Sequence, residues 1–155
     1  MIKDKIKFCL PWSYCNEKIY RLYLKSSKHI KNGNKLFACY YKNKIYNKYK
    51  CFISPYSNIK GVVDFPHPIG VVIGDGVTIG TNVIIYQNVT IGRKNVEKKY
   101  YPKIGSNVII CAGACILGDV KIGDNSIIGA NAVVLEDVPD NSIAVGIPAR
   151  IIKKK

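Results

Sequence analysis

The sequence predicts a mainly β protein, a parallel β-helix of six-residue repeats that follows a short helical segment. From Ile73 onward an Ile or Val recurs every six residues, usually followed by Gly, in the units IGDGVT, IGTNVI, IYQNVT, IGSNVI, ICAGAC, ILGDVK, IGDNSI, IGANAV and VLEDVP. A period of six fits neither an α-helix nor one long strand. It fits a short strand followed by a turn, so that three units make a triangular coil of about 18 residues.

Each position in the repeat has an expected role. The first residue points inward, the small fifth residue packs beside it, and the third residue points outward. The glycine at the second position is expected to permit the positive φ or tight bend that a corner needs. Successive coils would stack at about 4.8 Å, the spacing of neighbouring strands in a sheet.

Two irregularities interrupt the repeat, and breaks in a solenoid are where function is usually added. Phe65 and Ile73 are eight residues apart instead of six, so two extra residues bulge out near His67. Between Ile91 and Ile104 a unit is lengthened by seven residues, which predicts an extruded loop over 93–103.

The length of 155 residues suits one domain with an N-terminal appendage. We predict a mostly helical appendage over 1–51, a β-helix domain over 52–140 and a tail over 141–155. Within the appendage, apolar stripes predict helices over 16–31 and 34–50. The stripes consist of Ile19, Leu22, Tyr23, Ser26 and Ile30 in the first helix, and of Leu36, Phe37, Tyr40, Tyr41 and Ile45 in the second. We expect them to cover the end of the β-helix.

The formal net charge of +14 is concentrated in the first third of the chain. Residues 1–50 hold thirteen Lys or Arg and two Asp or Glu, whereas residues 51–155 hold eleven and eight. One interpretation is attraction to an anionic partner such as nucleic acid, lipid head groups or an acidic polysaccharide. The other interpretation is that the lysines lie on solvent-exposed faces and bind no partner. Because no nucleic-acid motif is present, we expect no nucleic-acid partner.

Cysteine usage and hydropathy predict a reduced, cytoplasmic protein. The six cysteines form no C-x-x-C pair, and the N-terminus lacks the pattern of a secretory signal. No apolar run approaches the roughly 20 residues that span a bilayer, so any attachment to a membrane would be at its surface.

The phase of the repeat assigns four outward residues to one face. Units that begin at 65, 85, 110 and 128 fall three units apart once the loop is discounted, so their third positions should form a column: His67, Gln87, Ala112 and Ala130. The column has a base candidate at one end, an amide beside it and two small residues that clear a groove for a long, thin ligand. The alternative interpretation is that His67 caps a turn and the alanines merely fit.

These features resemble a known family. The repeat, the histidine followed by PIGVVIG and the ending AVGIPARII are similar to the left-handed β-helix acyltransferases of the hexapeptide-repeat superfamily, in the serine acetyltransferase-like branch. The similarity covers about residues 52–152. It implies transfer of an acetyl group from acetyl-CoA to a hydroxyl, in a homotrimer whose sites lie between adjacent subunits.

The resemblance also implies roles for individual residues. His67 matches the catalytic histidine, the general base that removes the proton of the acceptor hydroxyl, and an imidazole suits this task because it is largely neutral near pH 7. Further residues match positions that contact the coenzyme: Ala112, Gly113, Ala130, Gly146, Pro148, Arg150 and Lys153.

Three departures from the family pattern concern the acceptor. Phe52 stands where serine acetyltransferases have an aspartate that orients the histidine, Pro66 replaces the aspartate before it, and Tyr100-Tyr101 replaces an Arg-His pair. Since paired charges for serine are missing and tyrosines suit sugars, we predict a sugar or surface-polysaccharide hydroxyl as acceptor. Gln87, Tyr100 and Tyr101 are the predicted acceptor-binding residues.

Three alternatives stay open. The first is serine O-acetyltransferase with a remodelled site, and the second is a non-catalytic trimeric scaffold. The third, a metal-dependent carbonic anhydrase on the same fold, needs three histidine ligands. Because the β-helix contains one histidine, we expect no metal.

Overall fold

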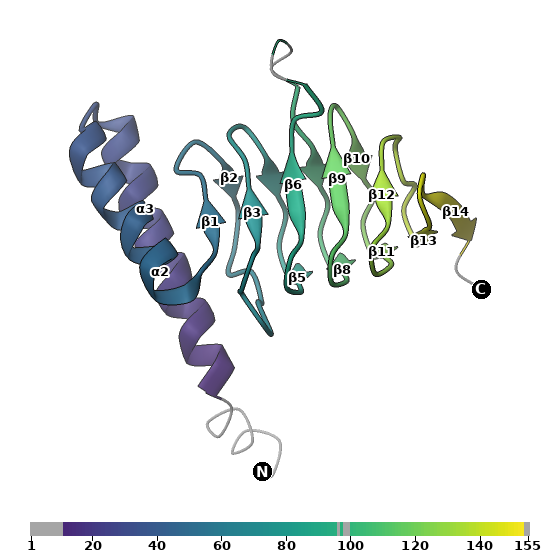
Figure 1. Cartoon of the computed structure of the whole chain (residues 1–155), viewed down its shortest axis with the longest axis horizontal. Helices are drawn as coiled ribbons and strands as arrows, with labels where there is room; N and C mark the ends of the chain where they lie inside the picture. Colours follow the sequence, from purple (N-terminus) through teal and green to yellow (C-terminus); the bar gives the residue numbers. More distant parts are fainter. Residues whose placement is uncertain (1–10, 96, 98–99, 154–155) are drawn as a thin grey trace.

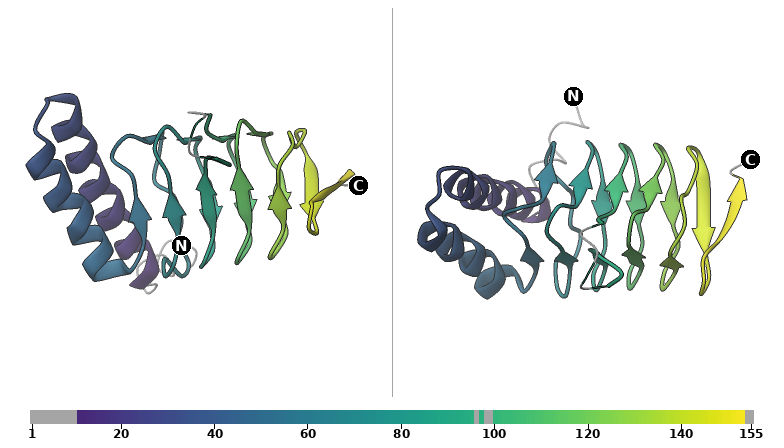
Figure 2. Two further views of the ribbon diagram at one scale, coloured as in Figure 1. Left: turned by 45° about the horizontal axis from the view of Figure 1, so that its top comes forward. Right: turned by 90° about the horizontal axis from the view of Figure 1, so that it is seen from above.

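The computed structural model describes residues 11–95, 97 and 100–153. Two antiparallel helices, α2 (Pro11–Lys31) and α3 (Lys35–Tyr49), stand at one end of a stack of short strands. Both views in Figure 2 show the stack running from the helices to the C-terminus as one prism. The predicted parallel β-helix with an N-terminal helical segment is confirmed (Figure 1).

The strands belong to three sheets, one on each side of the prism. Sheet A contains β1 (Phe52–Ile53), β3 (Val72–Ile73), β6 (Thr90–Gly92), β9 (Cys115–Leu117) and β12 (Val133–Val134). Sheet B contains β2 (Asn58–Ile59), β4 (Thr78–Ile79), β7 (Lys103–Ile104) and β10 (Lys121–Ile122). Sheet C contains β5 (Ile84–Ile85), β8 (Ile109–Ile110), β11 (Ile127–Ile128), β13 (Ser142–Val145) and β14 (Arg150–Lys153). The pairings are parallel except for that between β13 and β14.

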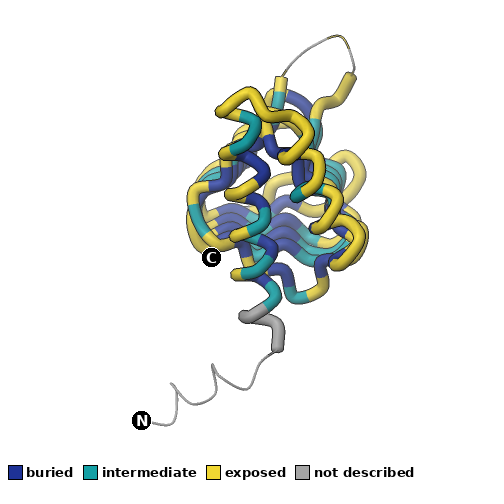
Figure 3. The backbone as a smooth tube through the Cα atoms, turned by 90° about the vertical axis from the view of Figure 1, so that its left-hand side faces the viewer, coloured by how far each residue is buried: buried dark blue, intermediate teal, exposed yellow. Residues whose placement is uncertain are grey.

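The first residue of each unit fills the interior of the prism. In sheet A the register stacks Ile53, Ile73, Ile91, Ile116 and Val134 in one column. Their side chains are at most 2 % exposed. Figure 3, seen from the helical end, shows the buried residues inside the coils and exposed residues at the corners. Because β-branched side chains pack well on a pleated surface, the Ile column makes the core continuous from coil to coil.

The last predicted unit, VLEDVP, is wrong as a six-residue repeat. Val138 forms a bridge with Ile122 and therefore takes the first position of the next unit. Val138 stands only four positions after Val134, the start of this unit, instead of six. The backbone N–H of Val138 donates to the carbonyl of Lys121 at 2.8 Å, which fixes the shortened corner.

The corners depend on asparagine for positive φ, contrary to the role expected for the second-position glycines. Six asparagines at fourth positions have φ between 54° and 58°: Asn82, Asn88, Asn107, Asn125, Asn131 and Asn141. Asparagine tolerates this left-handed region better than other residues with a side chain. Four of them form a ladder of side-chain amide hydrogen bonds, with distances of 3.2, 3.2 and 3.3 Å from Asn82 through Asn107 and Asn125 to Asn141.

Four second-position glycines, Gly80, Gly105, Gly123 and Gly129, are needed for close approach between coils. The carboxylate of Asp124 accepts the N–H of Ser106 at 2.6 Å, and that of Asp140 accepts the N–H of Asp124 at 2.9 Å. Each of these carboxylate oxygens occupies the space that a side chain would need at the second-position glycine of the neighbouring coil. A Cβ at Gly105 would lie 2.4 Å from Asp124 Oδ1, and one at Gly123 would lie 2.3 Å from Asp140 Oδ1.

The first helix covers the end of the prism with the predicted stripe. Ile19, Tyr23 and Ser26 are each at most 3 % exposed. The Tyr23 hydroxyl donates to the carbonyl of Ser57 at 2.7 Å and accepts the N–H of Ile59 at 3.2 Å. α2 therefore satisfies backbone groups at the first coil that no further coil could satisfy.

The stripe predicted for the second helix is wrong at three of its five positions. Leu36, Phe37 and Tyr40 are 85 %, 54 % and 56 % exposed, whereas Ile45 is buried as predicted. The other buried residues of α3, Ala38 and Tyr49, lie outside the predicted stripe. The Ser26 hydroxyl of α2 donates to the carbonyl of Ala38 at 2.7 Å. This bond requires a small residue at the helix contact, which turns the larger apolar residues outward. No helix in the described part of the chain is long and apolar enough to cross a membrane.

Candidate functional site

The strands of sheet C stack the four units that contain the predicted site. Ile85, Ile110 and Ile128 are in register, and a bridge between Asp64 and Ile84 places Phe65 over Ile85. The third positions of these units lie at the corner between sheets C and A. The face assignment made from the spacing therefore agrees with the pairing of the strands.

His67 itself lies outside the backbone column. The N–H of Asn131 donates to the carbonyl of Ala112 at 2.9 Å, and the N–H of Gly113 donates to that of Gln87 at 2.9 Å. The next bond in this series joins the N–H of Asn88 to the carbonyl of Ile69 at 3.0 Å. Ile69 thus continues the column above Gln87, and the insertion displaces His67 into a bulge over 66–68, where His67 is exposed between a half-buried Pro66 and a buried Pro68.

The bulge is held at both ends. At its start, the side-chain oxygen of Asn16 accepts the N–H of Phe65 at 3.1 Å, and Phe65 is 2 % exposed. At its end, the N–H of Gly70 donates to the carbonyl of Lys50, the C-cap of α3, at 2.9 Å. Gly70 has φ of +73°, and a Cβ there would lie 2.1 Å from Asn88 Oδ1. Sequence reasoning missed Asn16 because no local pattern indicates a helix residue that bonds across 49 positions.

Below the bulge, the corner is lined by small residues and one amide. Ala112 and Gly113 are half-buried and Ala130 is exposed. Gln87 is half-buried, and its side-chain oxygen is buried without a hydrogen-bond partner among the described residues. A buried acceptor without a donor is costly, so this oxygen is available to a ligand.

Two half-buried cysteines flank the same corner. Cys111 and Cys115 lie on either side of Ala112-Gly113, which sequence reasoning passed over. Burial raises the pKa of the Cys111 thiol above its ordinary value of 9.0, which keeps it protonated at neutral pH. Since the thiolate is the nucleophile, Cys111 is poorly suited to covalent catalysis. In the described part of the chain, no three His, Cys, Asp or Glu residues lie together as a metal site.

The tail folds back over the last coil. β13 and β14 pair around Gly146–Ala149, where the N–H of Ala149 donates to the carbonyl of Val133 at 2.8 Å. Gly146, Pro148 and Arg150 are exposed there. A Cβ at Gly129 would lie 2.7 Å from Val145 Cγ1, so the tail packs beside Ala130 at the far end of the column. Lys153 pairs with Ser142 through the backbone of β14.

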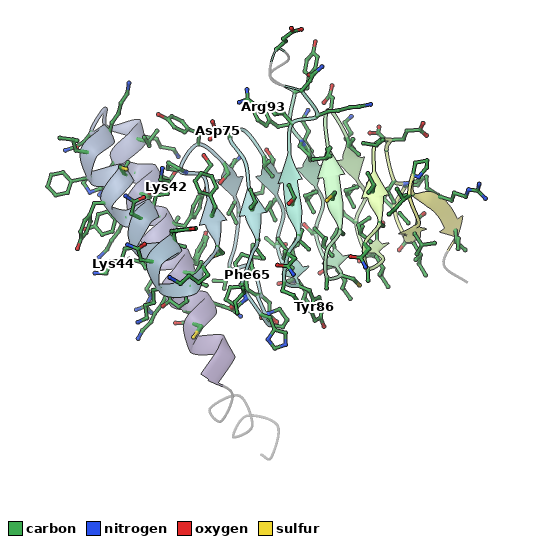
Figure 4. The ribbon with its side chains drawn as sticks, viewed as in Figure 1. Lys42, Lys44, Phe65, Asp75, Tyr86 and Arg93 are labelled. Atoms are coloured by element: carbon green, nitrogen blue, oxygen red, sulfur yellow. The ribbon has the colours of Figure 1, made fainter. Side chains whose placement is uncertain are left out.

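The extruded loop leaves a different edge of the prism. It extends over 93–102, since Lys103 already belongs to β7. The ring of Tyr101 packs on Gly76, where a Cβ would lie 2.5 Å from Cδ2, at the corner between sheets A and B. Tyr100 is 55 % exposed. Figure 4 shows Phe65 and Tyr86 along one edge of the prism and Arg93, which begins the loop, along the opposite edge. Within one chain the tyrosines and His67 are therefore not brought together.

Comparison with known proteins gives concordant results. Residues 101–136 match the family model described as bacterial transferase hexapeptide (six repeats). The serine acetyltransferase of Staphylococcus aureus strain Mu50 is 50 % identical over 103 residues, which is 66 % of this chain and 48 % of that protein. That of Staphylococcus epidermidis strain RP62A is 50 % identical over 104 residues, 66 % of this chain and 49 % of that protein. The chain spans about half the length of the curated relatives it matches.

Solved structures agree in fold. The serine acetyltransferase of Vibrio cholerae superposes with a TM-score of 0.83 at 34 % identity, over 88 % of this chain and 54 % of that one. The soybean enzyme complexed with serine superposes with a TM-score of 0.84 at 37 % identity, over 93 % of this chain and 62 % of that one. A serine acetyltransferase in complex with CoA superposes with a TM-score of 0.80 at 36 % identity, over 86 % of this chain and 55 % of that one.

The three-sided coil and its six-residue repeat agree with the matching family model, which is the class of hexapeptide-repeat transferases. Within that class, the chain has serine acetyltransferases as homologues in both sequence and structure.

These likenesses contradict our prediction of a sugar or polysaccharide acceptor and favour the serine alternative. The prediction gave too much weight to a few substituted positions. Phe52, the most suggestive of them, has a packing role instead, because the ammonium group of Lys42 in α3 lies 5.4 Å from the centre of its ring. The Phe52 ring therefore contributes to the contact between α3 and the first coil.

Proposed function

We propose that the protein is a serine O-acetyltransferase that uses acetyl-CoA as the acetyl donor. The observation that carries the proposal is the 50 % identity to staphylococcal serine acetyltransferases over 103 residues. Similar solved structures described as complexes with serine and with CoA support both substrates.

His67 is proposed as the general base. Its imidazole takes the proton of the serine hydroxyl while the hydroxyl oxygen attacks the thioester carbonyl. The carbon–sulfur bond then breaks, and the proton on the imidazole passes to the departing thiolate of CoA. The exposed position of His67 on the bulge supports this role, since the acceptor must reach the base from solvent.

The column below the bulge is proposed to hold the coenzyme. Ala112, Gly113 and Ala130 leave space along the corner for a thin pantetheine arm. The buried, unpartnered oxygen of Gln87 is placed to accept a hydrogen bond from the acceptor or from the arm. Gly146, Pro148, Arg150 and Lys153, in the tail that packs beside Ala130, would border the outer part of CoA.

A homotrimer is proposed as the active assembly. Tyr101 packs on Gly76 at the corner between sheets A and B, and Arg93, at the start of the same loop, lies on the edge opposite Phe65, which precedes the bulge. The loop and His67 can therefore share a site only when a neighbouring copy supplies one of them. In such an arrangement the extruded loop of one subunit closes over the bulge of the next. We also propose that the protein acts in the cytoplasm, where acetyl-CoA is available.

Purified full-length protein tests the proposed reaction. With acetyl-CoA and L-serine, we expect release of free thiol and formation of O-acetylserine, identified by mass spectrometry. L-alanine, which lacks the hydroxyl, serves as the control acceptor and should give only the background rate of hydrolysis. Thiol release that does not depend on L-serine would contradict the proposal.

A further inference from the structure

We propose that Asn16 in α2 is a positioning residue for His67, and that the helical hairpin holds the histidine-bearing bulge. This inference rests on the proposed role of His67 as the base. It concerns a residue outside the β-helix, in a part of the chain to which the proposed reaction assigns no task.

Asn16 is the clamp at the start of the bulge. Its side chain is 5 % exposed, and its oxygen accepts the N–H of Phe65 at 3.1 Å. Its amide nitrogen donates to the carboxylate of Asp64. An asparagine amide provides a donor and an acceptor in fixed relation, so one residue fixes the two successive residues, Asp64 and Phe65, that lead into the bulge.

The cap of α3 is the clamp at the other end. Lys50 adopts the left-handed conformation, with φ of 55°, and its N–H donates to the carbonyl of Tyr46 at 2.9 Å. Its own carbonyl accepts the N–H of Gly70 at 2.9 Å. Between the clamps, Pro66 and Pro68 flank the histidine and fix two φ angles. Few backbone torsions are therefore left free around His67.

Such a clamp explains how the base keeps its place without a carboxylate at Phe52. A general base must lie within hydrogen-bond reach of the proton it removes. A displacement of about 1 Å can cost about a hundredfold in rate. Because the bulge departs from the regular coil, the coil ladder alone does not fix it, and the helices supply the missing constraints.

The test compares Asn16→Ala with Ser26→Ala. Each variant loses one buried side chain of α2, but Ser26 bonds to Ala38 in α3 and does not touch the bulge. We expect Asn16→Ala to lower kcat for serine acetylation about tenfold while KM for acetyl-CoA changes less than about twofold. Ser26→Ala should leave kcat unchanged, even if it lowers the melting temperature as much as Asn16→Ala does.

A second readout does not depend on activity. Amide exchange at Phe65 should accelerate in Asn16→Ala and stay unchanged in Ser26→Ala. Equal kcat in the two variants, or unchanged exchange at Phe65, would overturn the clamp. Absence of serine acetylation by the unmodified protein would refute the proposed function instead, and the exchange measurement would still decide whether Asn16 holds the bulge.

A separate observation concerns the outer face of α3. We infer that the apolar patch of Leu36, Phe37 and Tyr40 docks on an anionic lipid surface. The three side chains are 85 %, 54 % and 56 % exposed, and together they line a shallow hollow beside the hairpin turn. The ammonium group of Lys44 lies 5.7 Å from the centre of the Tyr40 ring, at the border of the patch.

The charge around the apolar patch favours a lipid over a second copy of the chain. Residues 18–63 contain eleven Lys or Arg and no Asp or Glu. Two such surfaces would repel each other, whereas a bilayer with acidic head groups offers negative charge and an apolar interior together. Exposed Lys31 and Lys35 flank the turn next to the patch, in position to meet the head groups.

Vesicle sedimentation with the full chain tests this inference. We expect binding to vesicles of equal phosphatidylcholine and phosphatidylglycerol, weakened by salt, and little binding to phosphatidylcholine alone. Leu36→Ser, and Leu36→Ser combined with Phe37→Ser, should lower the partition coefficient, the double variant about tenfold. Tyr46→Ser is the matched control, since Tyr46 is 53 % exposed on another side of α3.

Three outcomes would overturn the lipid inference. One is the absence of binding to the acidic vesicles. Another is equal binding by the double variant, which would mean that charge alone attracts the protein. The third is self-association of the unmodified chain that both serine variants abolish without any vesicle binding, which would make the patch an interface between copies.

Discussion

Replacement of His67 by alanine should lower kcat for serine acetylation about a thousandfold, since a positioned general base contributes about 10²–10⁴ in rate. The affinity for CoA should change less than about twofold, because a base that acts on the acceptor proton adds little to ground-state binding of the coenzyme. A thiol-release assay gives kcat, and calorimetric titration with CoA gives the dissociation constant.

The chain offers a matched control in its other histidine. His29 stacks between the hairpin helices, with ring centres 5.3 Å from Phe37 and 5.6 Å from Tyr41. His29→Ala should therefore keep the rate of the unmodified protein. A turnover number that survives in His67→Ala would remove the base from the proposed mechanism. A parallel loss of CoA binding would indicate that the variant had disturbed the corner as a whole.

Replacement of Gly123 by alanine should destabilise the β-helix more than any surface change. The added Cβ would lie 2.4 Å from the backbone nitrogen of Asp140 and 2.6 Å from the carbonyl carbon of Pro139. Backbone atoms of the next coil cannot move aside without breaking the stack. An overpacked site of this kind costs about 3 kcal/mol, which corresponds to a fall of about 6–12 °C in melting temperature for a chain of this size.

Gly92 gives the control for this prediction. It follows Ile91 as Gly123 follows Ile122, yet no atom of the described residues lies within 4 Å of a Cβ at Gly92, and its φ is not positive. Gly92→Ala should therefore leave the melting temperature unchanged or raise it slightly, because alanine restricts the unfolded chain. Similar melting temperatures for Gly92→Ala and Gly123→Ala in thermal unfolding would show that close approach between coils is not what selects glycine.

The repeat predicted the fold because its period is a local property. Each unit has one inward apolar residue at its first position, usually Ile, and the same geometry is repeated in every coil, so the phase alone places Phe65, Ile85, Ile110 and Ile128 on one face. Where the spacing between units changes, counting residues no longer predicts which residue takes the first position of the next unit. The unit at Val134 is shortened, and only its pairing with the coil before it reveals the new register.

The helices show the opposite case. α3 has apolar residues on more than one side, so its sequence is compatible with several orientations. The contact between Ser26 and Ala38 selects one of them and leaves Leu36, Phe37 and Tyr40 outside. The stripe of large apolar residues therefore predicted the buried face of α3 poorly, because two helices that approach closely need a small residue where they cross.

The sequence by itself determined the β-helix, the order of its faces and His67 as the candidate base, since all three follow from periodic spacing and residue type. The spacing also indicated a bulge near His67. Only the tertiary structure decided that His67 stands on this bulge and outside the column, that Ile69 takes its place in the ladder, and that α2 and α3 hold the two ends. The reason is physical. An inserted residue has no partner in a repeat, so its position is set by contacts from elsewhere in the chain, and such contacts leave no periodic trace in the sequence.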